Sequence, residues 1–199
     1  MPETPEAATT PAMPPEVRDL VEALHATAPL ATLAVTGAGS RALAWLLGVG
    51  GASRTVLEAT VPYAGTSTAA YIGYEPAEFA SLEVASALAH AARLRSSVLA
   101  PEATVPLLGL GCAAAIATDR TKRGDHRAFV ALDAGGGEIA TGALNLTKGA
   151  RDRDAEEDVV SRMILNVLAA ASGVEARLEL GLLEGERIVA GVLGTEALR

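Results

Sequence analysis

The chain has 199 residues, a formal net charge of −8, three histidines and one cysteine. The acidic balance argues against nucleic acid as a general partner, because affinity for a phosphate backbone comes from many Lys and Arg side chains. Half of the residues are hydrophobic but only 3% are aromatic, so we expect a core of Ala, Leu, Val and Ile packed between layers.

The single cysteine indicates a reducing compartment. Cys112 lies in an apolar run, where a small buried residue is expected rather than a reactive thiol. No stretch has the pattern of a signal peptide or a membrane span, so we expect a cytoplasmic protein without membrane contact. No cofactor and no metal site are predicted.

Residues 1–13 are rich in proline and are expected to form a disordered tail, followed by a single domain over residues 14–199. Val17, Leu20, Val21 and Leu24 recur at helical spacing and predict a helix over residues 15–26. His25, near the end of that helix, is predicted to be solvated.

Residues 30–53 predict a strand, a glycine turn, a buried helix and a second glycine turn that ends on Ser53. Ser40 is expected to cap the helix, and Gly37 and Gly39 let the backbone approach a ligand closely. Free N–H groups at this helix start, beside Thr36, predict a seat for a phosphate or a carboxylate. The alternative is a tight strand-to-helix turn without a ligand.

Residues 55–61 predict a second strand, followed by a turn at Tyr63 and a short helix that ends at Ile72. A longer helix is predicted over residues 79–94, with His90 on its surface. Residues 104–116 predict a strand buried on both faces, as in a parallel sheet. This order predicts a three-layer α/β/α sandwich with a mixed, largely parallel sheet.

Residues 118–127 form a local basic segment in an acidic chain, directly after that buried strand. Ligands of open α/β sheets bind at the carboxyl ends of strands, so we expect this loop to hold an anionic ligand. The alternative is a solvated hairpin tip. The candidate residues are four cations and one histidine that could serve as acid or base: Arg120, Lys122, Arg123, Arg127 and His126.

The last third of the chain predicts a hairpin, a helix and a second hairpin. Strands over residues 128–132 and 138–146 flank a turn at residues 135–137. Lys148 and Arg151 precede a helix over residues 154–171 and could reach a site. Residues 176–183 and 187–193 are predicted as a hairpin that adds edge strands or mediates association.

Residues 14–171 resemble the C-terminal domain of CinA, the nicotinamide mononucleotide amidohydrolase family. The phrases AWLLGVGGASRTVLEATVPY, ATDRTKRGDHR and KGARDRDAEEDVVSR resemble the CinA-like half of proteins that continue into a nucleotidyltransferase-like domain. The stretches that match the turns of the family are Thr36-Gly37-Ala38-Gly39-Ser40, Gly51-Ala52-Ser53, Val61-Pro62-Tyr63, Gly109-Leu110-Gly111-Cys112-Ala113 and Gly149-Ala150-Arg151.

The resemblance implies an amidohydrolase acting on a pyridine nucleotide, with Ser53 attacking the carboxamide beside Tyr63, and Arg123, Arg127 or Arg151 holding the phosphate. The family lysine five residues after the tyrosine falls on Thr68, so a base for Ser53 would have to be Lys122 or His126. A second hypothesis is a pocket that binds a phosphorylated metabolite without turnover. The resemblance also implies a homo-oligomer and a possible nucleotidyltransferase-like partner.

Overall fold

The computed structural model describes residues 13–119 and 124–194. Residues 1–12 of the predicted tail and the predicted site residues Arg120, Lys122 and Arg123 lie outside the described residues. The helices within these ranges are α1 (Pro15–His25), α2 (Ser40–Gly48), the short η1 (Ala52–Arg54), α3 (Gly65–Ile72), α4 (Leu82–Leu99) and α5 (Arg153–Ala171). The strands are β1 (Leu30–Thr36), β2 (Val56–Thr60), β3 (Leu107–Ala115), β4 (His126–Asp133), β5 (Glu138–Leu146) and β6 (Ile188–Gly194).

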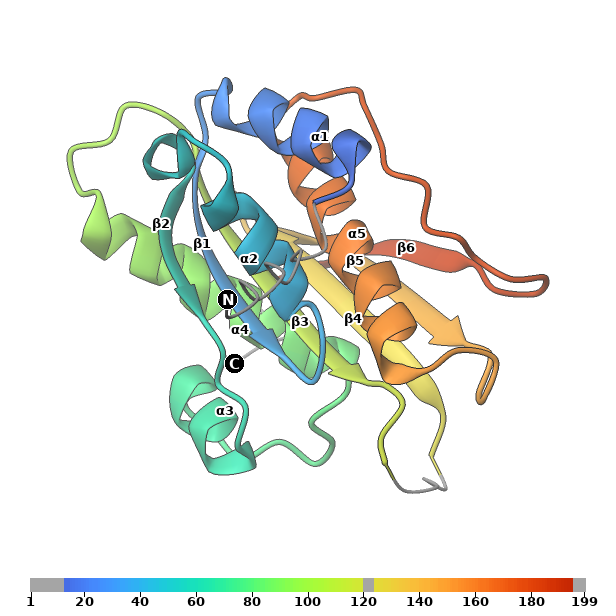
Figure 1. Cartoon of the computed structure of the whole chain (residues 1–199). Helices are drawn as coiled ribbons and strands as arrows, with labels where there is room; N and C mark the ends of the chain where they lie inside the picture. The colour runs from blue at the N-terminus through green and yellow to red at the C-terminus, as the bar shows by residue number, and fades with distance from the viewer. Residues whose placement is uncertain (1–12, 120–123, 195–199) are drawn as a thin grey trace, which may run out of the picture.

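The described strands form one sheet in the order β2-β1-β3-β4-β5-β6. β1 runs parallel to β2 and to β3, and β4, β5 and β6 are added antiparallel. Helices α1, α2 and α5 lie over one face of the sheet and α4 lies over the other (Figure 1). The predicted three-layer α/β/α fold with a mixed sheet is therefore confirmed, and its parallel pairings are confined to β2-β1-β3.

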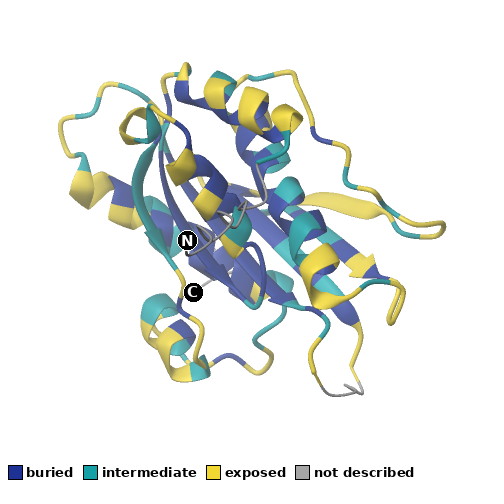
Figure 2. Cartoon of the chain, in the orientation of Figure 1, coloured by how far each residue is buried: buried dark blue, intermediate teal, exposed yellow. Residues whose placement is uncertain are grey.

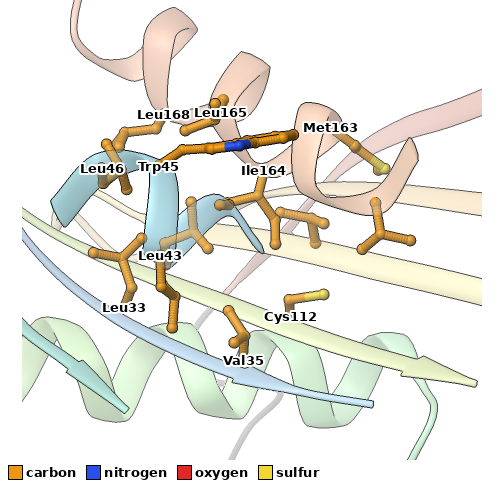
Figure 3. Close-up of a cluster of buried hydrophobic side chains, with 14 of the residues drawn as sticks. Leu33, Val35, Leu43, Trp45, Leu46, Cys112, Met163, Ile164, Leu165 and Leu168 are labelled. Carbon is orange, nitrogen blue, oxygen red and sulfur yellow. The ribbon is translucent and has the colours of Figure 1, made fainter. Parts of the chain in front are cut away.

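The larger core lies between the sheet and the layer of α1, α2 and α5. Trp45 of α2 lies between α2 and α5, beside Leu165 and Leu168 of α5 (Figure 3). Cys112 is fully buried in this layer, and burial raises the pKa of its thiol, as expected for a structural cysteine. Figure 2 shows that α1, α2 and α5 have buried residues on the side toward the sheet and exposed residues on the side away from it.

On the other face, glycines of β3 allow α4 to lie directly on the sheet. A Cβ atom at Gly111 would overlap the α4 backbone at Ala85 and Ala89, and one at Gly109 would overlap α4 one turn later. The small side chains of α4 complete this close contact, which explains how a core with few aromatic residues is packed.

We expect Gly111→Ala to lower the free energy of unfolding by about 1–3 kcal/mol or more, because the added methyl group must push α4 from the sheet. Gly50→Ala is the matched control, since a Cβ at Gly50 meets no atom within 4 Å. Urea denaturation of both variants measures the difference. Equal midpoints for the two variants would show that α4 accommodates the methyl group without cost.

Two local predictions were wrong for reasons of tertiary contact. His25 is buried, with Nδ1 2.8 Å from Thr55 Oγ1 and Nε2 3.0 Å from the Leu46 carbonyl oxygen. Residues 176–183 form no strand, because Leu178 pairs its backbone with the Asn166 side chain and packs along α5. Of the predicted last hairpin, β6 alone joins the sheet. Among the described residues, no helix is both long and apolar enough to cross a bilayer.

Candidate functional site

The carboxyl ends of β1 and β3 form a topological switch point. β1 continues through α2 to β2 on one side, and the chain returns through α3 and α4 to β3 on the other side (Figure 1). The strand order 2-1-3-4-5 places ligands of doubly wound proteins at the crevice between β1 and β3. The topology therefore predicts that a ligand site lies at the carboxyl ends of β1 and β3.

Two adjoining pockets open at this edge, with volumes of about 70 and 300 Å³. Both pockets are lined by Gly37, Tyr63 and Arg153, so they adjoin at these residues, and we refer to the two together as the depression. The smaller pocket is further lined by Val35, Ala38, Ser40, Val61 and Glu157, and the larger by Thr36, Phe79, Ala80, Ala114, Ala115, Ile116 and Thr118.

Arg153 spans this depression. It is the first residue of α5, whose N-cap Asp152 accepts a hydrogen bond from the Ala155 N–H. The guanidinium donates to the carbonyl oxygens of Ala117 at 2.9 Å and Gly37 at 3.3 Å, and Nη2 lies 3.5 Å from the Tyr63 hydroxyl. No described carboxylate lies within ion-pair distance of Arg153, so its charge is available to an anion.

The predicted anion seat at the start of α2 already holds a carboxylate of the chain. Glu157 Oε1 accepts hydrogen bonds from the backbone N–H groups of Gly39 and Arg41 and from the Ser40 hydroxyl, each at 3.0 Å. Ser40 is therefore the first residue of the helix and a donor to Glu157 rather than its N-cap. A negative charge at this helix start agrees with the predicted chemistry, but its source is α5.

Gly37 closes the end of β1 against the end of β3. Its φ is +82°, and a Cβ atom there would overlap the carbonyl group of Ala114. Glycine is required here for both reasons, and Thr36 before it lines the larger pocket. The backbone at Gly37 thus approaches Ala114 of β3 closely, whereas the sequence predicted a close approach to a ligand.

The structure does not bring Ser53 and Tyr63 together. Ser53 is exposed in η1, which precedes β2, whereas Tyr63 follows β2. Because β2 is parallel to β1, Tyr63 lies at the carboxyl end of these strands, as Gly37 does. Ser53 lies at their amino end, on the opposite side of the sheet's length. Ser53 lines neither of the two pockets that contain Tyr63.

Thr68, in the place of the family lysine, is buried and supports the turn that carries Tyr63. Its hydroxyl donates to the Pro62 carbonyl oxygen at 2.6 Å. The side-chain cation that the structure places beside the Tyr63 hydroxyl is Arg153.

His126 is buried and faces a carboxylate instead of a pocket. Its Nδ1 lies 2.8 Å from Oε1 of Glu156, a residue with no exposed surface, and Glu156 Oε2 accepts the Ala117 N–H at 2.7 Å. His126 lines neither pocket, although it lies at the carboxyl end of β3. The pair holds Ala117 through its N–H, and Arg153 binds the carbonyl oxygen of the same residue.

The two predicted arginines that the structure describes are engaged elsewhere. Arg127 forms an ion pair with Glu78 and lies over the Phe129 ring, 5.8 Å from its centroid. Arg151 makes two 2.9 Å hydrogen bonds to the carboxylate of Glu186. Neither side chain lines the pockets at β1 and β3.

Arg151 lowers the pKa of Glu186 from its ordinary value of 4.5 to about 2. A lowered pKa in the folded state adds stability that is complete above pH 4.5 and is lost as the pH falls toward 2. We therefore expect Glu186→Gln to be less stable than the parent at pH 6, with a difference that shrinks between pH 4.5 and 2. Urea midpoints over this range measure it, and a difference independent of pH would contradict the ion pair.

The sequence prediction missed Arg153, Glu157 and Phe79. Arg153 is one of three arginines and lysines within six residues, and the sequence favoured Lys148 and Arg151 because they precede the expected helix. Glu157 lies among four acidic residues at positions 154–158, a pattern that is typical of the solvated start of a helix. The available signal was the Asp152 cap, which places Arg153 on the first turn of a helix that begins at the edge of the sheet.

No protein-family model matches the chain, and no curated protein sequence matches it. Solved structures do share its fold. The competence/damage inducible protein CihA from Agrobacterium tumefaciens superposes with a TM-score of 0.62 at 16% identity, covering 81% of this chain and 98% of that one.

Two CinA superfamily proteins superpose with TM-scores of 0.56. The protein from Escherichia coli is 13% identical and covers 75% of this chain and 84% of its own. The protein from Enterobacter cloacae is 16% identical and covers 87% and 98%. The chain thus has the fold of CinA superfamily proteins, which confirms the resemblance at the level of the fold.

Proposed function

We propose that the depression at the carboxyl ends of β1 and β3 binds a phosphorylated small metabolite, with Arg153 on the phosphate. The observation that carries the proposal is the Arg153 guanidinium, which is held by two backbone carbonyl groups and has no described carboxylate as a partner. Carbonyl acceptors orient the guanidinium without neutralising it. An arginine fixed in this way is suited to a phosphate or a carboxylate.

The aromatic side chains favour a ligand with a planar ring. Tyr63 and Phe79 line the larger pocket together with the backbone at the ends of β1 and β3. A volume of about 300 Å³ is at the lower end of small-molecule sites and suits one ring with a sugar. A pyridine nucleotide such as nicotinamide mononucleotide combines this ring with a phosphate.

Binding without turnover is the reading that the geometry supports best. Ser53 lies at the opposite edge of the sheet, Thr68 is in the place of the lysine, and His126 is bound to Glu156. None of these three side chains lines the pockets, so none of them is positioned as a nucleophile or a base for a ligand there.

Amide hydrolysis of nicotinamide mononucleotide is the second candidate function. It is favoured by one contact in the smaller pocket, where the Ser40 hydroxyl lies 3.0 Å from Glu157 Oε1, beside Tyr63 and Arg153. In that case the Ser40 oxygen would attack the carboxamide carbon, and Glu157 would accept the hydroxyl proton and pass it to the departing ammonia as the C–N bond breaks. Water would then hydrolyse the Ser40 ester to the carboxylate. Glu157 Oε1 also accepts hydrogen bonds from two backbone N–H groups, so the oxygen nearest the Ser40 hydroxyl is already occupied.

Two measurements with the full chain separate these functions. Nicotinamide mononucleotide should raise the melting temperature, and nicotinamide riboside, which lacks the phosphate, should raise it much less. Ammonia release from the mononucleotide should be absent. Ammonia release that Ser40→Ala abolishes would establish the second function. The absence of both binding and ammonia release would exclude nicotinamide mononucleotide as the ligand in either function.

A further inference from the structure

Arg153 and Glu157 lie one turn apart on α5 and both line the smaller pocket, but they do not form an ion pair with each other. Oppositely charged residues at this spacing usually meet on the surface of a helix. Here the Arg153 guanidinium is held by the carbonyl oxygens of Gly37 and Ala117, and the Glu157 carboxylate is held by the start of α2. The fold therefore keeps a positive and a negative charge separate on the wall of one pocket.

The two carboxylate oxygens of Glu157 have different surroundings. Oε1 accepts hydrogen bonds from the N–H groups of Gly39 and Arg41 and from the Ser40 hydroxyl, and the Ser161 hydroxyl lies 3.5 Å from the same oxygen. Oε2 has no hydrogen-bond partner among the described residues, and it is not enclosed by the protein. Because Glu157 lines the smaller pocket, Oε2 is the oxygen that a ligand in this pocket can reach.

An unpartnered carboxylate oxygen in a pocket discriminates between ligand groups. An NH₂ group or a cation can bind to it, whereas a carboxylate would bring two negative charges into contact. Arg153 and Glu157 are the charged side chains among the described residues that line the smaller pocket, whose volume of about 70 Å³ suits a group of a few heavy atoms. A phosphate on Arg153 would leave Oε2 to select the group at the other end of the ligand.

We propose that Glu157 is the residue that determines specificity in this site, because its Oε2 selects a ring with a carboxamide and rejects the corresponding carboxylic acid. This inference rests on the proposed function, in which Arg153 holds the phosphate. The pyridinium ring of nicotinamide mononucleotide adds a positive charge, which the carboxylate also favours. The preference does not depend on turnover, because Glu157 acts on the ligand before any bond breaks.

Two ligands that differ only in this group test the preference of the parent. Isothermal titration of the full chain at low salt should show nicotinamide mononucleotide binding about tenfold or more tighter than nicotinic acid mononucleotide. Equal affinities, or tighter binding of the acid, would overturn the role of Glu157 and leave the proposed phosphate site intact. Failure of both ligands to bind would overturn the proposed function and this inference together.

Glu157→Gln should reverse the preference. The glutamine oxygen can accept the N–H groups of Gly39 and Arg41 as Oε1 does, which places the NH₂ group where Oε2 was. That NH₂ group would donate to the carboxylate of the acid and would offer no acceptor to the carboxamide. We therefore expect the acid to bind about tenfold tighter than it binds the parent, and the amide to bind more weakly.

Asp154→Asn is the matched control. It removes one negative charge from the same end of α5, but the Asp154 side chain is 78% exposed and lines neither pocket. This variant should keep the preference of the parent. A melting temperature of Glu157→Gln near that of the parent would show that the start of α2 is intact. A folded Glu157→Gln that still prefers the amide, or an equal change of preference in Asp154→Asn, would overturn the inference.

Discussion

Arg153→Ala should weaken the binding of nicotinamide mononucleotide about tenfold or more, while the affinity for nicotinamide riboside stays nearly constant. A hydrogen bond to a charged group contributes about 1.5–3 kcal/mol, and 1.4 kcal/mol corresponds to a factor of ten. The riboside lacks the phosphate that the guanidinium would hold. Isothermal titration with both ligands at low salt measures the two affinities.

The fold should tolerate this substitution. Arg153 is exposed, and its partners are carbonyl groups at the open edge of the sheet that water can reach. Arg153→Lys should bind with intermediate affinity, because lysine keeps the charge but loses the planar pair of donors. Arg18→Ala, an exposed arginine on α1, is the control and should bind as the parent does.

An equal loss for the mononucleotide and the riboside would place Arg153 against another part of the ligand. Unchanged affinity for both ligands would remove Arg153 from the site and leave the cations at residues 120–123 of the basic segment as candidates for the phosphate. The two results therefore lead to different assignments of the residue that holds the phosphate. The contrast between the ligands is therefore the measurement that matters most for the proposed function.

Local patterns predicted the layers of the fold well. The apolar run at residues 30–35, the glycine turn after it and the helix that follows agree with β1, Gly37 and α2. These elements are specified by neighbours within a few residues, through backbone freedom and hydrophobic period. The glycine turn at residues 135–137 is equally local, with a positive φ at all three positions.

The errors concern partners that are distant in sequence. His25 is buried because Thr55 and Leu46 supply partners for its ring, and Arg151 is bound because Glu186 follows 35 residues later. No periodicity within a helix or a strand contains this information. That Arg153 and not Arg151 lines the pockets likewise depends on how the first turn of α5 is oriented relative to the sheet.

The glycine turn shows how a contact distant in sequence changes the interpretation of a local pattern. The sequence predicts an anion at the start of α2, and the anion is the carboxylate of Glu157, 118 residues after Gly39. A carboxylate from a distant helix is invisible to a local pattern. Because Glu157 occupies the N–H groups at the start of α2, we expect a phosphate at Arg153 instead of at the helix start.

Glu156→Ala should lower the free energy of unfolding by about 3–5 kcal/mol, because it breaks a buried pair and leaves polar partners behind. Glu156 has no exposed surface and satisfies both His126 and the Ala117 N–H. Removal of the carboxylate leaves these donors without an acceptor inside the protein. Urea denaturation at neutral pH measures the loss.

Glu156→Gln should cost less, since its amide oxygen can still accept the Ala117 N–H while its NH₂ group faces the imidazole. Glu175→Ala, at an exposed position after α5, is the control for removal of a carboxylate and should stay within about 0.5 kcal/mol of the parent. A loss in Glu156→Ala no larger than in Glu175→Ala would mean that the pair does not support the fold. Arg153 donates to the carbonyl oxygen of the same Ala117, whose N–H loses its acceptor in Glu156→Ala, so the alanine variant should also bind the mononucleotide more weakly than the parent. That second effect would tie the buried pair to the position of the arginine at the proposed site.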